Sequence, residues 1–105
     1  MDNKKLLKEL KSLLECKLSL KIRKIFLYGS QINGNSQNYS DYDILIVLEN
    51  DYNWKLEEAI YNTAYEIMLL YDVVLDIKII SIKDMETLKG QQPYIQNAIK
   101  SRVFA

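Results

Sequence analysis

Histidine is absent from the 105-residue sequence, and cysteine occurs once, as Cys16. Without histidine, the chain cannot form a Ser-His-Asp triad or a typical zinc site of cysteine and histidine. Cys16 cannot form a disulfide within the chain, which is typical of proteins in a reducing compartment. We expect Cys16 to be a small packed side chain rather than a reactive thiol.

An excess of one charge and a long apolar run are lacking as well. The 14 basic residues balance 14 acidic ones, so no overall field attracts nucleic acid or an anionic membrane. The N-terminal stretch is too charged for a signal-peptide core, and no apolar segment is long enough to span a bilayer. We therefore expect a cytoplasmic protein. One local basic cluster is interpreted as a solvated helix end and turn, in preference to a binding patch: Lys17, Lys21, Arg23 and Lys24.

Glycine and proline are scarce, and the apolar content suits a globular protein. At this length we expect a single domain, residues 1–105, with one core. Apolar spacing predicts a first amphipathic helix with Leu6, Leu7, Leu10, Leu13 and Leu14 on one face. Strands are predicted at 24–28, 43–48 and 72–80, and a polar loop at 31–40. A second helix carries Leu56 to Met68, and a short helix follows at 81–89. Pro93 opens a last helix, which has Tyr94, Ile95, Ala98 and Ile99 on one face.

This order of elements predicts an α/β fold, with a small mixed sheet of about three strands flanked by helices. Two aspartates, Asp41 and Asp43, precede its most hydrophobic strand. Residues two apart in a strand face the same side, so both carboxylates project together. Like charges on one face repel, and a divalent cation is the usual relief. The spacing therefore indicates a magnesium site, although strand-end aspartates in solvated turns would be the simpler alternative.

Asp76 adds a third carboxylate within an otherwise apolar strand. If that strand lies beside the 43–48 strand, Asp76 converges with Asp41 and Asp43. Three aspartates on adjacent strands suit phosphoryl or nucleotidyl transfer with two metal ions, which stabilise the attacking and leaving oxygens. Asp72 is the rival third carboxylate because it has the same strand parity, but we prefer Asp76.

Gly29 and Ser30 follow the 24–28 strand directly. A glycine allows the backbone to approach a phosphate, and a serine hydroxyl with nearby amides can hold it. Together, "LYGS", the gap and "SDYDILIVL" resemble the polymerase-β-like nucleotidyltransferase superfamily, with its Gly-Ser and Asp-x-Asp motifs. The resemblance covers roughly residues 20–100 and points to a minimal nucleotidyltransferase of the kind found as antitoxins.

The resemblance implies a role for each matching residue. Gly29 and Ser30 would contact the β- and γ-phosphates of a nucleoside triphosphate. Asp41 and Asp43 would bind magnesium, and Asp76 would complete the site and help to activate the acceptor hydroxyl.

Asn33 is a departure from the family's pattern, because many relatives carry an arginine at this place. A neutral amide can hydrogen-bond a phosphate but cannot neutralise its charge. Asn33 is therefore expected to bind phosphate more weakly than an arginine, without affecting the metal site.

The resemblance implies a magnesium-dependent transfer of a nucleoside monophosphate, AMP from ATP, to an acceptor hydroxyl. Minimal members often act beside a helical toxin encoded nearby, so a tyrosine of such a partner is one expected acceptor. Two alternatives remain open. The chain could neutralise a partner by binding alone, or it could modify a small molecule, as aminoglycoside-type relatives do.

Overall fold

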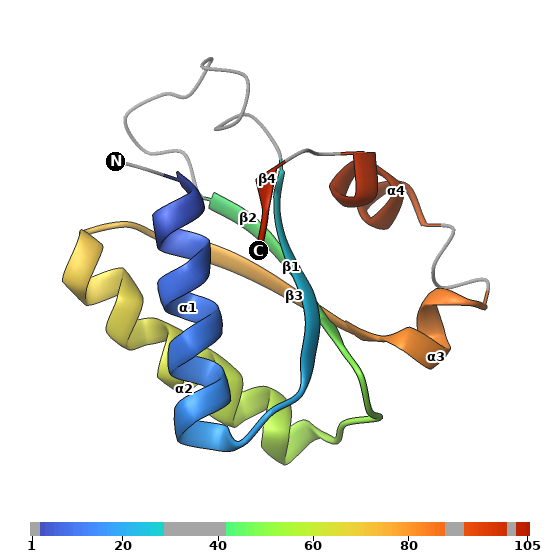
Figure 1. Cartoon of the computed structure of the whole chain (residues 1–105), viewed down its shortest axis with the longest axis horizontal. Coiled ribbons are helices and arrows are strands. Elements are labelled where there is room, and N and C mark those ends of the chain that lie inside the picture. Colours follow the sequence, from blue (N-terminus) through green and yellow to red (C-terminus); the bar gives the residue numbers. More distant parts are fainter. Residues whose placement is uncertain (1–2, 29–41, 88–91, 101–102) are drawn as a thin grey trace.

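The computed structural model describes residues 3–28, 42–87, 92–100 and 103–105, which form a sheet with helices on both faces (Figure 1). This arrangement confirms the predicted mixed α/β fold. In chain order the elements are α1 (Asn3–Leu18), β1 (Ile22–Tyr28), β2 (Tyr42–Leu48), α2 (Trp54–Tyr71), β3 (Leu75–Ser81), α3 (Ile82–Met85), α4 (Pro93–Lys100) and β4 (Val103–Phe104).

The sheet has the strand order β3-β2-β1-β4. β1 pairs antiparallel with β2 and with β4, whereas β2 and β3 are parallel. The fourth strand, β4, was not predicted. Phe104 pairs with Phe26, and the backbones of Ile25 and Ala105 exchange two hydrogen bonds of 2.9 Å. A strand of two residues is too short to carry a periodic pattern, which is why the sequence did not reveal it.

The larger core lies between one face of the sheet and the helices α1 and α2 (Figure 1). The predicted leucine stripe supplies the contribution of α1, of which Leu6, Leu7, Leu10 and Leu14 are buried. Each such side chain stabilises the fold by roughly 1.5–3 kcal/mol when fully buried. Cys16 lies off this stripe and is exposed, so our expectation that it is packed was wrong.

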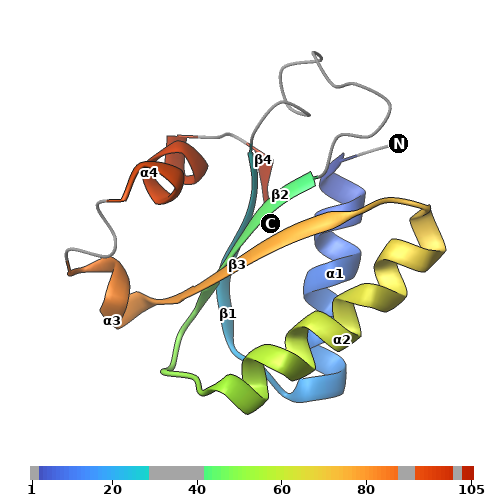
Figure 2. The ribbon, with the colours of Figure 1, turned by 180° about the vertical axis from the view of Figure 1, so that it is seen from behind.

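A smaller core fills the opposite face, beneath α4. Figure 2 shows α4 on the side of the sheet away from α1 and α2. The buried residues of this smaller core are Phe26, Leu45, Val47, Ile80, Ile95 and Ala98. β2 is therefore covered on both faces, which explains its unbroken apolar run. Ile99, which we expected on the buried face of α4, is instead 42% exposed.

Polar residues stand at both ends of α2. The Asn53 side chain accepts a hydrogen bond from the Leu56 amide at its N-terminus. At its C-terminus, Asp72 adopts a left-handed conformation with φ of 55°, which aspartate tolerates better than most residues. β3 consequently begins at Leu75, three residues later than predicted. None of the described helices combines the length and the apolarity needed to cross a membrane.

Candidate active site

Asp43 and Asp76 lie side by side on neighbouring strands. Each is the second residue of its strand, and the parallel register of β2 and β3 pairs the two directly. Adjacent strands are about 4.8 Å apart, so one ligand can reach both carboxylates. The expectation that the strand carrying Asp76 runs beside β2 is therefore confirmed.

Both carboxylates project from the face of the sheet that carries α4. Ile44 and Ile77, the residues that follow them, belong to the core beneath α1 and α2. Because successive side chains in a strand alternate between faces, Asp43 and Asp76 point to the other side. Asp43 is half-buried and Asp76 is exposed, so both remain open to a ligand from solvent.

Tyr28 extends this row onto a third strand. It pairs antiparallel with Asp43 and packs against the smaller core on the same face. Side chains of directly paired residues lie on one face of a sheet. Tyr28, Asp43 and Asp76 therefore form a continuous row across β1, β2 and β3. Tyr28 also immediately precedes the Gly29-Ser30 motif in the chain.

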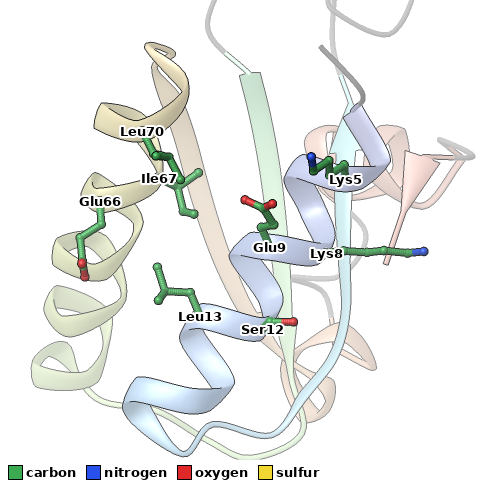
Figure 3. A pocket seen from close by; sticks show the side chains of 8 residues that line it. All are labelled: Lys5, Lys8, Glu9, Ser12, Leu13, Glu66, Ile67 and Leu70. Carbon is green, nitrogen blue, oxygen red and sulfur yellow. The ribbon is translucent and has the colours of Figure 1, made fainter.

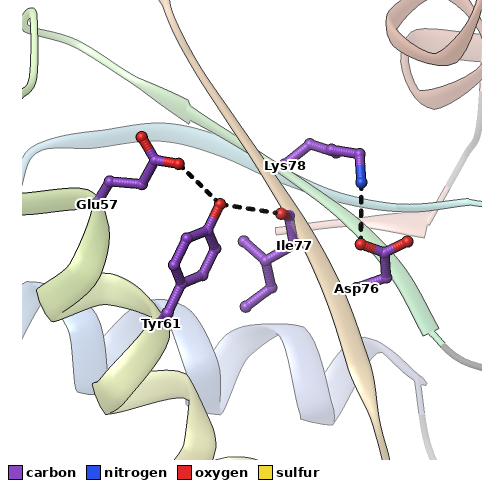
Figure 4. Close-up of polar contacts among 5 residues, drawn as sticks. All are labelled: Glu57, Tyr61, Asp76, Ile77 and Lys78. Carbon is purple, nitrogen blue, oxygen red and sulfur yellow. Dashed lines mark hydrogen bonds and ion pairs between the residues drawn. The ribbon is translucent and has the colours of Figure 1, made fainter. Parts of the chain in front are cut away.

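Lys78 forms an ion pair with Asp76. Its Nζ lies 3.0 Å from Oδ1 of Asp76, and both side chains are about half exposed. Figure 4 shows the pair on the side of β3 away from α2. Lys78 and Asp76 are two residues apart and share a face, as strand alternation requires. A positive charge thus lies beside a predicted metal ligand, which we did not anticipate from the sequence.

The outer edge of β3 is covered by tyrosines from α2 and the segment before it. The Tyr61 hydroxyl lies 3.0 Å from Oε1 of Glu57 and 3.5 Å from the carbonyl oxygen of Ile77 (Figure 4). Burial and the hydrogen bond to Glu57 raise the pKa of Tyr61 to about 12, so the phenol stays neutral at physiological pH. Tyr52 donates to the carbonyl oxygen of Ile79 at 2.8 Å. The Tyr52 hydroxyl therefore satisfies a carbonyl of an edge strand.

Four of the predicted site residues lie outside the described part of the chain: Gly29, Ser30, Asn33 and Asp41. Their roles stay predictions. Asp72, the rival third carboxylate, caps α2 and does not belong to β3. The structure therefore supports Asp76 over Asp72 as the partner of Asp43.

Asp43 and Asp76 suit a hard divalent cation, because their carboxylate oxygens project together from one face. Magnesium prefers a few carboxylates completed by water and substrate oxygens. Within the described ranges, no three acidic, histidine or cysteine side chains gather closely enough to hold a metal by themselves. Asp41, which the alternation of strand residues predicts on the same face, is the remaining candidate ligand.

A second feature, on the other side of the sheet from the carboxylates, is an open groove between α1 and α2 (Figure 3). Its volume is about 650 Å³. Its walls combine apolar and charged side chains: Lys5, Lys8, Glu9, Ser12, Leu13, Glu66, Ile67 and Leu70. The hydroxyl of Tyr71 donates a hydrogen bond to Glu9 and so links the two helices.

The outer face of α2 carries large apolar side chains that the sequence analysis overlooked. Trp54, Tyr61, Tyr65 and Leu69 follow one another at intervals of seven, four and four residues, which aligns them on one side of a helix. All are exposed, and Leu69 and Leu70 are exposed by 67% and 72%. We call Trp54, Tyr61, Tyr65 and Leu69 the α2 outer face; Leu70 lies on another side of the helix, where it lines the groove with α1. An exposed apolar patch of this kind is typical of a surface that contacts another molecule.

The basic cluster of the sequence does not form one patch. Lys17 pairs with Glu66 at 2.6 Å, and Arg23 pairs with Glu49 at 3.4 Å. Lys24 lies over the ring of Phe104, 4.3 Å from its centroid. These separate contacts support the interpretation as a solvated surface.

Comparison with known proteins relates the chain to one protein family. Residues 8–102 match the family described as polymerase beta, nucleotidyltransferase. A candidate protein adenylyltransferase of Methanocaldococcus jannaschii is 33% identical over 76 residues, which cover 72% of this chain and 71% of that protein.

Solved structures share the fold at low sequence identity. A toxin–antitoxin crystallised with AMP-PNP has a TM-score of 0.57 at 20% identity over 75% of this chain. The toxin–antitoxin MntA–HpeT has a TM-score of 0.55 at 17% identity over 79% of this chain. A candidate nucleotidyltransferase of Sulfolobus solfataricus gives 0.51 at 14% identity, with 97% of this chain and 76% of that chain covered. The chain spans 57% and 59% of the two toxin–antitoxin chains.

Proposed function

The chain belongs to the polymerase beta nucleotidyltransferase family, and on this premise we propose that it transfers AMP from ATP to an acceptor hydroxyl with the help of magnesium. The observation that carries the proposal is the direct register of Asp43 and Asp76 on one face of the sheet. Two carboxylates beside each other on one face of the sheet repel each other, and they suit a site for a metal-bound triphosphate.

In the proposed reaction, the acceptor oxygen forms a bond to the α-phosphorus of ATP. The bond from that phosphorus to the oxygen bridging to the β-phosphate breaks, and pyrophosphate leaves. Asp76 takes up the proton of the acceptor hydroxyl. Magnesium, held by Asp41, Asp43 and Asp76, would supply positive charge against the phosphate oxygens.

The loop after β1 is proposed to hold the remaining phosphates. Ser30 donates a hydrogen bond to a phosphate oxygen, and Gly29 lets the backbone come close. Asn33 contributes a neutral amide contact. Tyr28 supports this assignment, because it pairs with Asp43 and leads directly into Gly29.

The proposed acceptor is a hydroxyl of another protein, such as a tyrosine of a helical toxin encoded nearby. Support comes from the relative described as a candidate protein adenylyltransferase and from the two toxin–antitoxin neighbours in fold. The α2 outer face offers apolar surface for such a partner, on the side of the sheet away from the carboxylates.

A second candidate function is neutralisation of a partner by binding alone. The α2 outer face favours this function, because an exposed apolar surface can bind a partner without any catalytic reaction. The neutral Asn33 also favours it, since the phosphate contact would be weaker than one made by arginine.

Transfer of label from ATP separates these functions. The purified chain is incubated with magnesium, the product of the neighbouring reading frame, and ATP labelled at either the α- or the γ-phosphate. The proposal expects label on the partner from the α-position and none from the γ-position. A stable complex that carries label from neither position would contradict the transferase proposal and favour neutralisation by binding.

A further inference from the structure

Lys78 forms an ion pair with Asp76, one of the predicted site carboxylates. It lies two residues beyond Asp76 on β3, and its register partner on β2 is Leu45. Leu45 is fully buried on the α4 face, whereas Lys78 keeps 44% of its side chain exposed. A lysine at such a position can bury its methylene stem and still direct its ammonium toward Asp76.

None of the residues predicted to hold phosphate or metal is positively charged. Gly29, Ser30 and Asn33 are all neutral, and Asp41, Asp43 and Asp76 are acidic. A triphosphate brings several further negative charges, which magnesium only partly offsets. A cation beside these residues would therefore stabilise the bound nucleotide, and Lys78 is already in contact with one of them.

We propose that Lys78 has two alternating partners: it pairs with Asp76 in the metal-free protein and binds the triphosphate when nucleotide and magnesium are present. This inference rests on the proposed transferase function. In the first state, the ammonium of Lys78 offsets the repulsion between the neighbouring carboxylates of Asp76 and Asp43. In the second state, Asp76 binds the metal, and the ammonium moves to a phosphate oxygen.

The exchange of partners requires little energy. The Lys78–Asp76 pair is about half exposed, and exposed ion pairs contribute little to stability. A lysine ammonium carries three donors on a flexible stem, and it is a common phosphate ligand. Lys78 can therefore leave Asp76 without disturbing β3, whose backbone is held by the pairing with β2.

Replacing Lys78 by glutamine should affect the affinity for metal and the affinity for nucleotide differently. By calorimetry, Lys78→Gln should bind Mn²⁺ alone at least as tightly as wild type, because the metal no longer competes with the ammonium for Asp76. It should bind a non-hydrolysable ATP analogue with magnesium about tenfold more weakly, through loss of a charge-assisted hydrogen bond. Lys78→Arg should restore most of the nucleotide affinity.

Lys17→Gln is the matched control. Lys17 is 47% exposed and also forms an ion pair, but with Glu66 on the other side of the sheet. Lys17→Gln should leave the affinities for Mn²⁺ and for the ATP analogue unchanged. If wild type binds the analogue and Lys78→Gln binds it as tightly as Lys17→Gln does, the role of Lys78 is overturned while the transferase proposal stands. Weaker Mn²⁺ binding by Lys78→Gln would overturn the competition for Asp76. Failure of wild type to bind the analogue would overturn both proposals.

Discussion

Asp43 and Asp76 are direct register partners on the parallel strands β2 and β3, and both project from the face opposite α1 and α2. Like charges at paired positions of a sheet destabilise it by up to about 1 kcal/mol. The pairing therefore destabilises the fold, and a bound cation would relieve the part of this repulsion that Lys78 does not offset.

Asp43→Asn should abolish the response of the protein to magnesium while leaving the fold intact. The amide keeps the size of the carboxylate but removes the charge that holds the cation. Without metal, the variant should be as stable as wild type or more stable by up to about 1 kcal/mol. Thermal melts with and without magnesium measure both effects. An equal magnesium-induced rise in Tm for variant and wild type would contradict the assignment of Asp43.

Ser30→Ala should weaken nucleotide binding without removing the metal site. Losing one hydrogen bond to a charged phosphate costs roughly 1.5–3 kcal/mol. Calorimetric titration with a non-hydrolysable triphosphate and magnesium measures this loss, and Ser12→Ala on α1 serves as the control. Unchanged affinity in Ser30→Ala would mean that Ser30 does not hold phosphate.

Asn33→Arg should raise the rate of transfer. A charge-assisted contact is roughly twice as strong as a neutral one, so a gain of about tenfold is expected. The rate of pyrophosphate release, measured with the partner present, tests this gain. If the chain acts by binding alone, neither wild type nor Asn33→Arg will release pyrophosphate.

Tyr61 should make the stability of the protein depend on pH at alkaline values. Its pKa is raised from 10.0 to about 12 in the folded state, so folding favours the neutral phenol. The stabilising contribution is therefore complete below pH 10 and is lost as the pH rises toward 12. Tyr61→Phe should be less stable than wild type by about 0.5–1.5 kcal/mol at pH 8, and this difference should shrink at pH 11. Urea unfolding at both pH values measures it, with Tyr65→Phe as the control. A difference that stays constant would contradict the assigned role of Glu57 and burial.

Strand alternation was the strongest guide in the sequence. It correctly placed Asp76 on the face away from Ile77, and the apolar run after Asp43 correctly indicated a buried strand. We had expected helices largely on one side of the sheet, whereas α4 covers the other face. Helical spacing likewise identified the buried stripes of α1 and α2. These patterns depend on local geometry, which the order of residues determines directly.

Features that depend on distant contacts were missed. β4 forms only because Phe104 meets Phe26 on β1, more than seventy residues earlier in the chain. The pattern also continued the strand back to Asp72, because it could not show that this residue ends α2 in a left-handed conformation. The sequence places Lys78 and Asp76 on the same face of one strand, but their contact depends on side-chain conformation, which the pattern does not determine.

Magnesium-dependent pyrophosphate release from ATP, in the presence of the partner, tests the central claim most directly when three proteins are compared. Asp76→Asn removes the carboxylate paired with Asp43, whereas Asp72→Asn changes the rival aspartate at the end of α2, where asparagine also tolerates the left-handed conformation. The account predicts turnover by wild type and by Asp72→Asn, and a loss of about 100-fold or more in Asp76→Asn. Turnover by Asp76→Asn equal to that of wild type would contradict it.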